Sequence, residues 1–174
     1  AGLRAATRDR LAGLGLGRTD ASIPESFSFY DQVLDTAVTV GATAADWRDA
    51  VGLVAKALAR ADFARLGYGA DMVRMIEEHG PYVVIAPGLA LAHARPGPRV
   101  LARGMAVVTL ADPVPFGHPY HDPVRVVVGL ASTSSEEHLE MVAAVANVFN
   151  DEGLVARLAA AETIDDVRSI LGAD

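Results

Sequence analysis

The segment VRVVVGL at residues 124–130 constrains the fold most, because every residue in it except Arg125 is apolar or glycine. A strand that is apolar on both faces must be covered on both faces of its sheet. Further strand patterns lie at residues 36–40, 82–85, 89–92 and 104–110. Helical patterns stand before and after this β-rich middle. The order predicts an α/β fold, with a central mixed β-sheet covered by α-helices on both faces.

Helical periodicity is clearest at about residues 44–62, where apolar side chains recur on one face. These side chains are Trp47, Val51, Val54 and Leu58. Thr43 followed by Asp46 resembles a capping box at the start of this helix. A second helix is expected over about 70–79, ended by Gly80-Pro81. Later helices are expected at about 135–149, 152–160 and 164–171, and the proline-rich segment 111–123 is expected to be a loop or an irregular sheet edge.

The length of the chain fits one domain. Its 174 residues are 51% hydrophobic, which is enough to bury a core without disulfide or metal staples. Residues 1–22 mix arginine with glycine and alanine, and we interpret them as an N-terminal extension or linker. The domain is therefore expected to occupy residues 23–174.

Composition excludes several kinds of function. Cysteine is absent, so disulfides, thiolate nucleophiles and cysteine-ligated metals are excluded. The net charge of -7 argues against nucleic acid as a partner, because nucleic-acid affinity comes largely from clustered Lys and Arg. No apolar run approaches the roughly 18 residues of a membrane span, and no secretory signal is recognisable. A soluble, cytoplasmic protein is expected.

His93 is the first candidate for a reactive group. It follows the predicted strand in APGLALAHARP, and Arg95-Pro96 ends the run. An imidazole at the end of a buried strand faces the depression in which ligands gather in open α/β sheets. The alternative is an ordinary histidine hydrogen-bonded to the backbone.

His138 is the second candidate. Ser134 as N-cap and Glu137 at the third position predict a capping box, which puts His138 in the first helical turn. There the helix dipole should lower its pKa, favour a neutral N–H donor and attract an anion. The stripe Leu139, Val142, Val145 or Ala146, and Phe149 is expected to enter the core. A solvent-facing His138 without a role is the alternative.

The other histidines give weaker signals. His118 and His121 in FGHPYHDP, with Asp122, could be offered as a metal site. Their spacing matches neither the i, i+4 helical pair of zinc proteases nor an alternating strand, so metal is not expected. His79, at the end of its helix, is expected to cap that helix.

Three separated blocks carry a family resemblance. EEHGPYVVIAPGLALAHARP, VTLADPVPFGHPYHDPVRVVVGLAS and EEHLEMVAAVANVFNDEGLVARL resemble the mannitol/fructose-type enzyme IIA domains of the sugar phosphotransferase system (PTS), closest to the ascorbate-specific branch. The likeness covers roughly residues 36 to 172. In that family the histidine ending a G-x-A-x-x-H stretch is phosphorylated, and here the stretch is Gly88 to His93. A second histidine, at the start of the helix after the last strand, falls on His138.

The resemblance implies a function. His93 would accept phosphate from the carrier protein HPr and donate it to the cysteine of a IIB component, as a cytoplasmic phosphotransferase that meets the membrane IIC complex only peripherally. His138 would stabilise the phosphoryl group. Leu89 and Leu91 would form an apolar rim, and Glu136 and Glu137 would meet basic partners. No metal or organic cofactor is implied, and a homodimer is left open.

The sequence departs from the family pattern at three positions. Ala92 stands where proline often precedes the reactive histidine. Glu78 aligns with an arginine of mannitol-type members, and Arg95 is our candidate replacement cation. His121 stands before Asp-Pro where the ascorbate branch has asparagine, so an additional imidazole is expected near the site.

Two other functions compete with sugar transport. The first is a IIA-like regulatory domain, whose phosphorylation controls a partner protein. The second is a metal hydrolase that uses His118, His121 and Asp122. Transfer of phosphate to a IIB cysteine distinguishes the transport role from the regulatory one.

Overall fold

The computed structural model describes Phe29 and residues 33–172. The extension expected over residues 1–22 lies outside these described residues. Within them, no helix is both long enough and apolar enough to cross a membrane.

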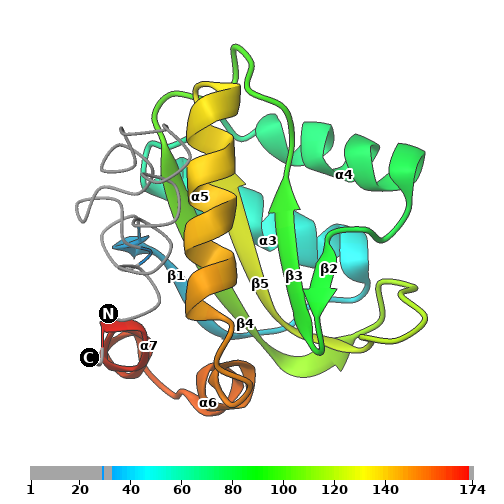
Figure 1. Cartoon of the computed structure of the whole chain (residues 1–174), viewed down its shortest axis with the longest axis vertical. Coiled ribbons are helices and arrows are strands. Elements are labelled where there is room, and N and C mark those ends of the chain that lie inside the picture. The colour runs from blue at the N-terminus through cyan, green and yellow to red at the C-terminus, as the bar shows by residue number, and fades with distance from the viewer. Residues whose placement is uncertain (1–28, 30–32, 173–174) are drawn as a thin grey trace, which may run out of the picture.

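Within the described residues five strands form one mixed sheet in the order β1-β4-β5-β3-β2 (Figure 1). The strands are β1 (Val33–Ala42), β2 (Val84–Ala86), β3 (Leu89–His93), β4 (Gly104–Val114) and β5 (Val124–Ala131). β1 runs parallel to β4 and β3 runs parallel to β5, whereas the β4–β5 and β2–β3 pairs are antiparallel. The predicted mixed sheet is confirmed.

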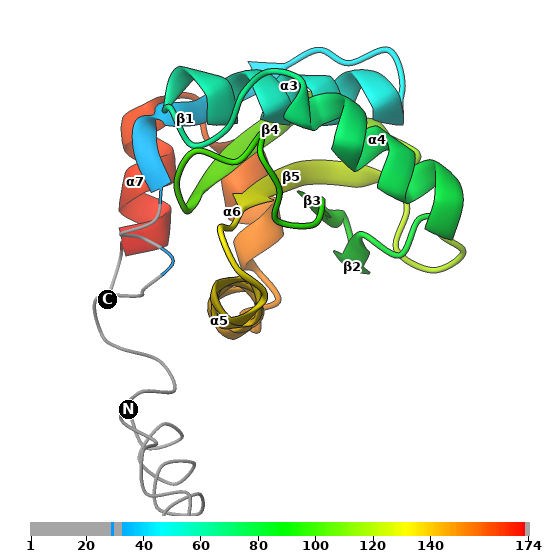
Figure 2. The same cartoon turned by 90° about the horizontal axis from the view of Figure 1, so that it is seen from above.

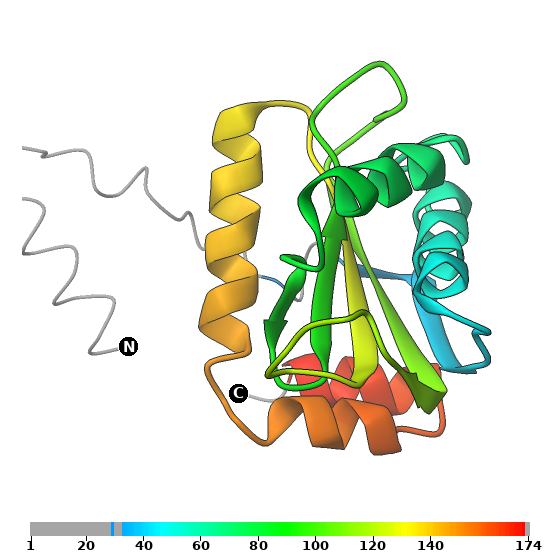
Figure 3. The same ribbon diagram turned by 90° about the vertical axis from the view of Figure 1, so that its right-hand side faces the viewer.

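Helices cover both faces of the sheet, as VRVVVGL requires. They are α3 (Trp47–Arg60), α4 (Tyr68–His79), α5 (Ser135–Val148), α6 (Leu154–Ala160) and α7 (Ile164–Gly172). Figure 3 shows α3 and α4 on one face and α5 on the other, and Figure 2 shows the same layers from above. Side chains of β5 alternate between the two cores: Val127 packs with α3 and α4, and Val126 and Val128 pack with α5 and α6.

Two local predictions were wrong, and the structure decides between two alternatives in a third case. The N-cap of α3 is Asp46 and not Thr43, because the Asp46 carboxylate accepts a hydrogen bond from Asp49 N at 2.8 Å. The segment 111–114, expected to be a loop or an irregular sheet edge, is the irregular end of β4. A register shift between Thr109 and Val114 lets the strand continue through Pro113, which has no N–H to donate, and the ladder resumes at the Val114–Val124 pair. β2 begins at Val84, two residues later than expected.

The fold brings three chain segments together at the carboxyl ends of β3 and β5. β3 and β5 are parallel and adjacent, with His93 paired to Leu130, so their carboxyl ends lie together. β5 leads within four residues into α5, and α4 lies across the same end of β3 (Figure 1). Residues from α4, β3 and α5 therefore meet there.

Candidate active site

His93 is the last residue of β3 and is partly buried. Its Nδ1 lies 3.0 Å from the carbonyl oxygen of Leu91. A carbonyl can only accept a hydrogen bond, so Nδ1 carries the proton and Nε2 holds a free electron pair. Burial lowers the pKa of His93 below the usual value for histidine, and the bond to Leu91 only partly opposes this. His93 is therefore neutral and nucleophilic at neutral pH.

His138 faces His93 from the first turns of α5. The two ring centroids lie 5.0 Å apart, with the planes tilted by 46°. Burial, and then the proximity of His93, lower the pKa of His138, because each imidazolium would repel the other. Its Nδ1 is buried without a hydrogen-bond partner in the described part of the chain, which leaves Nε2 to meet a ligand.

The start of α5 follows the predicted capping box in part. Ser134 Oγ accepts a hydrogen bond from Glu137 N at 3.1 Å, as expected. The Glu137 carboxylate, however, bonds one residue further back, to Thr133 N at 2.7 Å and to the Thr133 hydroxyl at 2.9 Å. The Glu137 carboxylate thus stabilises the turn before α5. Of the two acidic residues predicted to meet partner proteins, only Glu136 is exposed and makes no hydrogen bond to this turn.

A cleft of about 680 Å³ opens over the two histidines. Its walls come from α4, from the end of β3 and from the start of α5. The lining residues are Met75, His93, Ala94, Arg95, Pro96, Ser134, Ser135, His138 and Leu139. The site is therefore open to a large partner and is not an enclosed small-molecule cavity.

The apolar rim consists of different residues from those predicted. Leu89 and Leu91 are 0% and 2% exposed and belong to the core beneath α5, so they cannot form a rim. Leu139, expected in the core, is 68% exposed and lines the cleft. The helix turns by about 100° per residue, so a buried stripe through Met141 and Val145 turns Leu139 outward.

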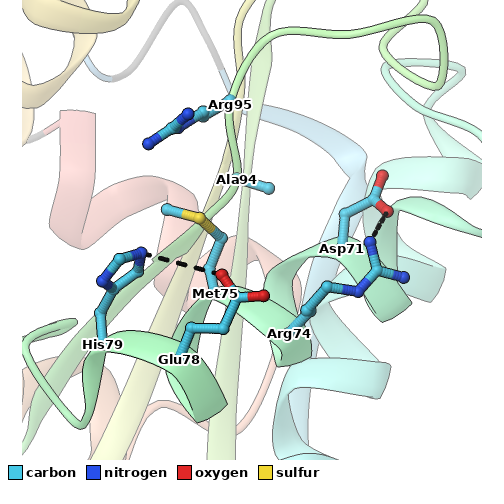
Figure 4. A pocket seen from close by; sticks show the side chains of 7 residues that line it. All are labelled: Asp71, Arg74, Met75, Glu78, His79, Ala94 and Arg95. Atoms are coloured by element: carbon cyan, nitrogen blue, oxygen red, sulfur yellow. Dashed lines mark ion pairs between the residues drawn. The ribbon is translucent and has the colours of Figure 1, made fainter.

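A second, smaller cleft of about 380 Å³ shares one wall with the first. Figure 4 shows the side chains that line this second cleft. Met75, Ala94 and Arg95 line both clefts. The Arg95 side chain is exposed and stands two residues beyond His93. The other lining residues are Asp71 and Arg74, which form an ion pair at 3.8 Å, and Glu78 and His79, which form one at 4.0 Å.

Tyr82 is a neighbour of His93 that the sequence interpretation missed. Its ring meets the His93 ring edge-on with centroids 5.7 Å apart, and it meets His79 at 6.2 Å. Burial raises the pKa of Tyr82, and the charge of Arg95 partly opposes this. The sequence predicted residue 82 only as the start of a strand, and no local pattern indicates that its ring turns toward residue 93.

The structure does not bring His121 beside His93. Its carbonyl oxygen accepts a hydrogen bond from Gly88 N at 2.9 Å, at the opposite end of β3. Five residues of strand at about 3.3 Å each put that point about 16 Å from His93. The prediction of an additional imidazole near the site is therefore wrong. The β4–β5 connection carries His121 and lies where β5 begins, whereas His93 lies beside the end of β5.

In the loop that carries His118 and His121, the His118 ring and the Asp122 carboxylate bond to backbone groups of the loop itself. The two rings stack with centroids 4.6 Å apart, and His118 Nδ1 accepts hydrogen bonds from the backbone N–H groups of residues 120 and 121. The Asp122 carboxylate accepts from Phe116 N and Gly117 N. In the part of the chain that the structure describes, no three His, Cys, Asp or Glu side chains are arranged to hold a metal ion.

Comparison with known proteins relates this chain to one family. The family profile described as "Phosphoenolpyruvate-dependent sugar phosphotransferase system, EIIA 2" matches residues 33–173. The ascorbate-specific PTS system EIIA component of Shigella boydii serotype 4 (strain Sb227) is 36% identical over 135 residues, which are 77% of this chain and 88% of that protein.

Solved structures share the fold. The solution structure of the mannitol-specific cryptic phosphotransferase enzyme IIA from Escherichia coli superposes with a TM-score of 0.74 at 23% identity, covering 84% of this chain and 99% of that one. The mannitol enzyme IIA solved in complex with phosphorylated enzyme IIB from Escherichia coli gives 0.70 at 23% identity, covering 80% and 96%.

Proposed function

The chain belongs to the EIIA 2 family of the phosphoenolpyruvate-dependent sugar phosphotransferase system, and on this basis we propose that it carries a phosphoryl group on His93. The observation that carries the assignment to His93 is its hydrogen bond from Nδ1 to Leu91 O, which leaves the Nε2 electron pair free beside an open cleft. Similarity to ascorbate-specific relatives supports uptake of an ascorbate-like sugar as the process served.

The first step is attack on a phosphohistidine of HPr. The Nε2 electron pair of His93 forms a bond to phosphorus as the phosphorus–nitrogen bond of the donor breaks. The donor imidazole leaves with the bonding pair. Because the cleft of about 680 Å³ is open, a donor protein can bring its phosphoryl group in line with Nε2.

The second step passes the group to a IIB component. A cysteine thiolate of IIB attacks phosphorus, and the electron pair of the phosphorus–nitrogen bond returns to His93 Nε2. The complex of a similarly folded IIA with phosphorylated IIB supports this choice of acceptor. The Nδ1 hydrogen bond to Leu91 O persists through both steps and stabilises the positive charge on the phosphorylated ring.

Three groups stabilise the phosphoryl oxygens in this proposal. His138, at 5.0 Å between ring centroids, donates through Nε2. The first N–H groups of α5, at Ser135 and Glu136, point out of the helix end, where an anion is favoured. Arg95 provides a positive charge in the shared wall of the two clefts. Met75, Pro96 and Leu139 then limit the access of water to the phosphohistidine.

The proposal includes the setting of the protein. We assign residues 23–174 to the IIA domain and residues 1–22 to an extension. With HPr and IIB as its partners, the protein would act in the cytoplasm, with only peripheral contact to a membrane IIC component.

The test is phosphorylation by enzyme I, HPr and phosphoenolpyruvate, followed by intact mass. The wild type should gain one acid-labile phosphoryl group, His93→Ala should gain none, and His138→Ala should gain it slowly. His121→Ala is the matched control, because it removes an imidazole from the other end of β3 and should behave as wild type. No gain in the wild type would refute the carrier role. Retention of the group in the presence of IIB would indicate a regulatory domain.

A further inference from the structure

The hydroxyl of Tyr68 lies between the ends of β3 and β5, beside the residue that follows His93. Its oxygen is 2.9 Å from Ala94 N, 2.9 Å from Leu130 O and 3.1 Å from Ala94 O. Tyr68 is the first residue of α4 and is 1% exposed. A side chain from a helix therefore holds backbone groups of two strands at the point where the reactive histidine leaves the sheet.

The phenol takes the place of a sheet hydrogen bond. Leu91 N donates to Val83 O at 2.7 Å, toward the β2 side. Successive N–H groups of a strand point to opposite sides, so Ala94 N, three residues later, faces β5. In the register that pairs His93 with Leu130, its direct acceptor there would be Leu130 O. Instead, Ala94 N donates to the Tyr68 hydroxyl oxygen, and the hydroxyl donates its proton to Leu130 O.

We propose that Tyr68 is a positioning residue for phosphoryl transfer. Its hydroxyl ends the hydrogen-bonded pairing of β3 with β5 at His93 and thereby fixes the direction in which the His93 ring enters the cleft. The inference rests on the proposed function, since it concerns the preparation of His93 as a nucleophile. The bond from His93 Nδ1 to Leu91 O forms only when residues 91–94 hold one backbone geometry, and Tyr68 holds the last of these residues.

The same residue links two of the three walls of the cleft, α4 and the end of β3. Met75 stands on α4 two turns after Tyr68 and lines the cleft with His93. The hydrogen bond between Ala94 N and the Tyr68 hydroxyl holds the first turn of α4 against the end of β3. It therefore sets the distance between Met75 on α4 and His93 on β3. Burial raises the pKa of Tyr68 to about 12, so its hydroxyl stays protonated throughout the physiological range and can donate and accept together.

Tyr68→Phe tests the inference, with Thr109→Val as the matched control. Thr109 is 1% exposed, and its hydroxyl accepts a hydrogen bond from Gly41 N at 2.8 Å between β1 and β4. Each variant removes one buried hydroxyl that accepts from a backbone N–H, but only Tyr68 contacts the end of β3. Both variants should lower the urea midpoint, and Tyr68→Phe should lower it more, because the Tyr68 hydroxyl also donates to a backbone carbonyl.

Two readouts distinguish positioning from stability. Tyr68→Phe should slow phosphorylation from phospho-HPr by about 10- to 100-fold, as expected for a small misplacement of a reacting group, whereas Thr109→Val should stay within about twofold of wild type. The ¹⁵N signals of the His93 ring should report one Nδ1-protonated tautomer in the wild type and in Thr109→Val, and a mixture in Tyr68→Phe. Equal rates and identical ring signals in the two variants would overturn the inference.

The outcomes stay separate from those of the proposed function. If the wild type accepts no phosphate, the proposed function fails, while the ¹⁵N comparison still decides whether Tyr68 orients His93. If Tyr68→Phe does not fold, an NMR measurement on the wild type tests the inference instead. The Tyr68 hydroxyl proton should be visible at neutral pH, with a through-space contact to the Ala94 amide proton. A rapidly exchanging Ala94 amide and no such hydroxyl signal would overturn the inference.

Discussion

A single methyl group added at Gly129 should force α3 away from the sheet. Gly129 pairs with Ala92 of β3 on one side and with Ala106 of β4 on the other, so a row of small residues crosses the sheet beneath α3. A Cβ built on Gly129 would lie 2.0 Å from Val54 Cγ1 and 3.4 Å from Leu58 Cδ1. Carbon atoms in contact prefer about 3.5–4.0 Å, so Val54 must move by about 1.5 Å or more.

The expected cost of Gly129→Ala follows from this overlap. Val54 is 0% exposed, so it has no space into which it can rotate, and overpacking of this kind typically costs about 1–3 kcal/mol. Val54→Ala alone removes buried methyl groups and should also destabilise, by about 2 kcal/mol. In the double variant the shorter side chain leaves room for the new methyl. The double variant should therefore be more stable than the sum of the single changes predicts, by about 1 kcal/mol or more.

Urea unfolding of the four proteins measures this coupling. The control is Gly52→Ala on α3, where a Cβ meets no atom within 4 Å and replacement of a helical glycine should be neutral or stabilising. A Gly129→Ala variant as stable as the wild type, or single changes that simply add, would refute the argument that the row of small residues sets the distance between α3 and the sheet.

Four further predictions follow from the site. The folded-state pKa of His93 and of His138 is lowered, so below about pH 6.5 the unfolded chain binds more protons than the folded chain. The urea midpoint should therefore drop between pH 7 and pH 5, and it should drop less in the double variant His93→Ala/His138→Ala. Phosphorylation of His93 should raise the pKa of His138, seen by NMR titration, because a nearby anion replaces a nearby imidazole. Leu139→Asp should leave stability within about 0.5 kcal/mol but slow transfer between proteins, because Leu139 is exposed on the cleft. Ser134→Ala should cost about 1 kcal/mol through loss of the bond to Glu137 N, measured by urea unfolding.

The sequence predicted the order of strands and helices well because the signals for it are local. An apolar run such as residues 124–130 must be buried on both faces, and Gly80-Pro81 ends a helix by its own backbone preferences: Gly80 has φ of 83°. Proximity of His93 and His138 was expected only from the family resemblance. Their ring contact depends on the pairing of β3 with β5, which no local pattern encodes.

The residues that were missed or misplaced depend on contacts between distant segments. Tyr68 lies 26 residues before Ala94 and 62 before Leu130, so its three hydrogen bonds leave no periodic trace in the sequence. Leu139 was assigned to the core because an apolar residue fits more than one stripe of a helix. Only the contacts of Met141 and Val145 with the sheet decide which stripe is buried.

The alternation of β3 explains why the side chain that meets the His93 ring and the side chain that holds the next backbone group come from different helices. Ala90, Ala92 and Ala94 face the core of α3 and α4, whereas Leu89 and Leu91 face the core of α5. By the same period of two, His93 belongs to the α5 side, where His138 meets its ring, and Ala94 belongs to the α4 side, where Tyr68 meets its backbone. A register shift of one residue would exchange these sides, so the pairing of β3 with β5 fixes the site and the core together.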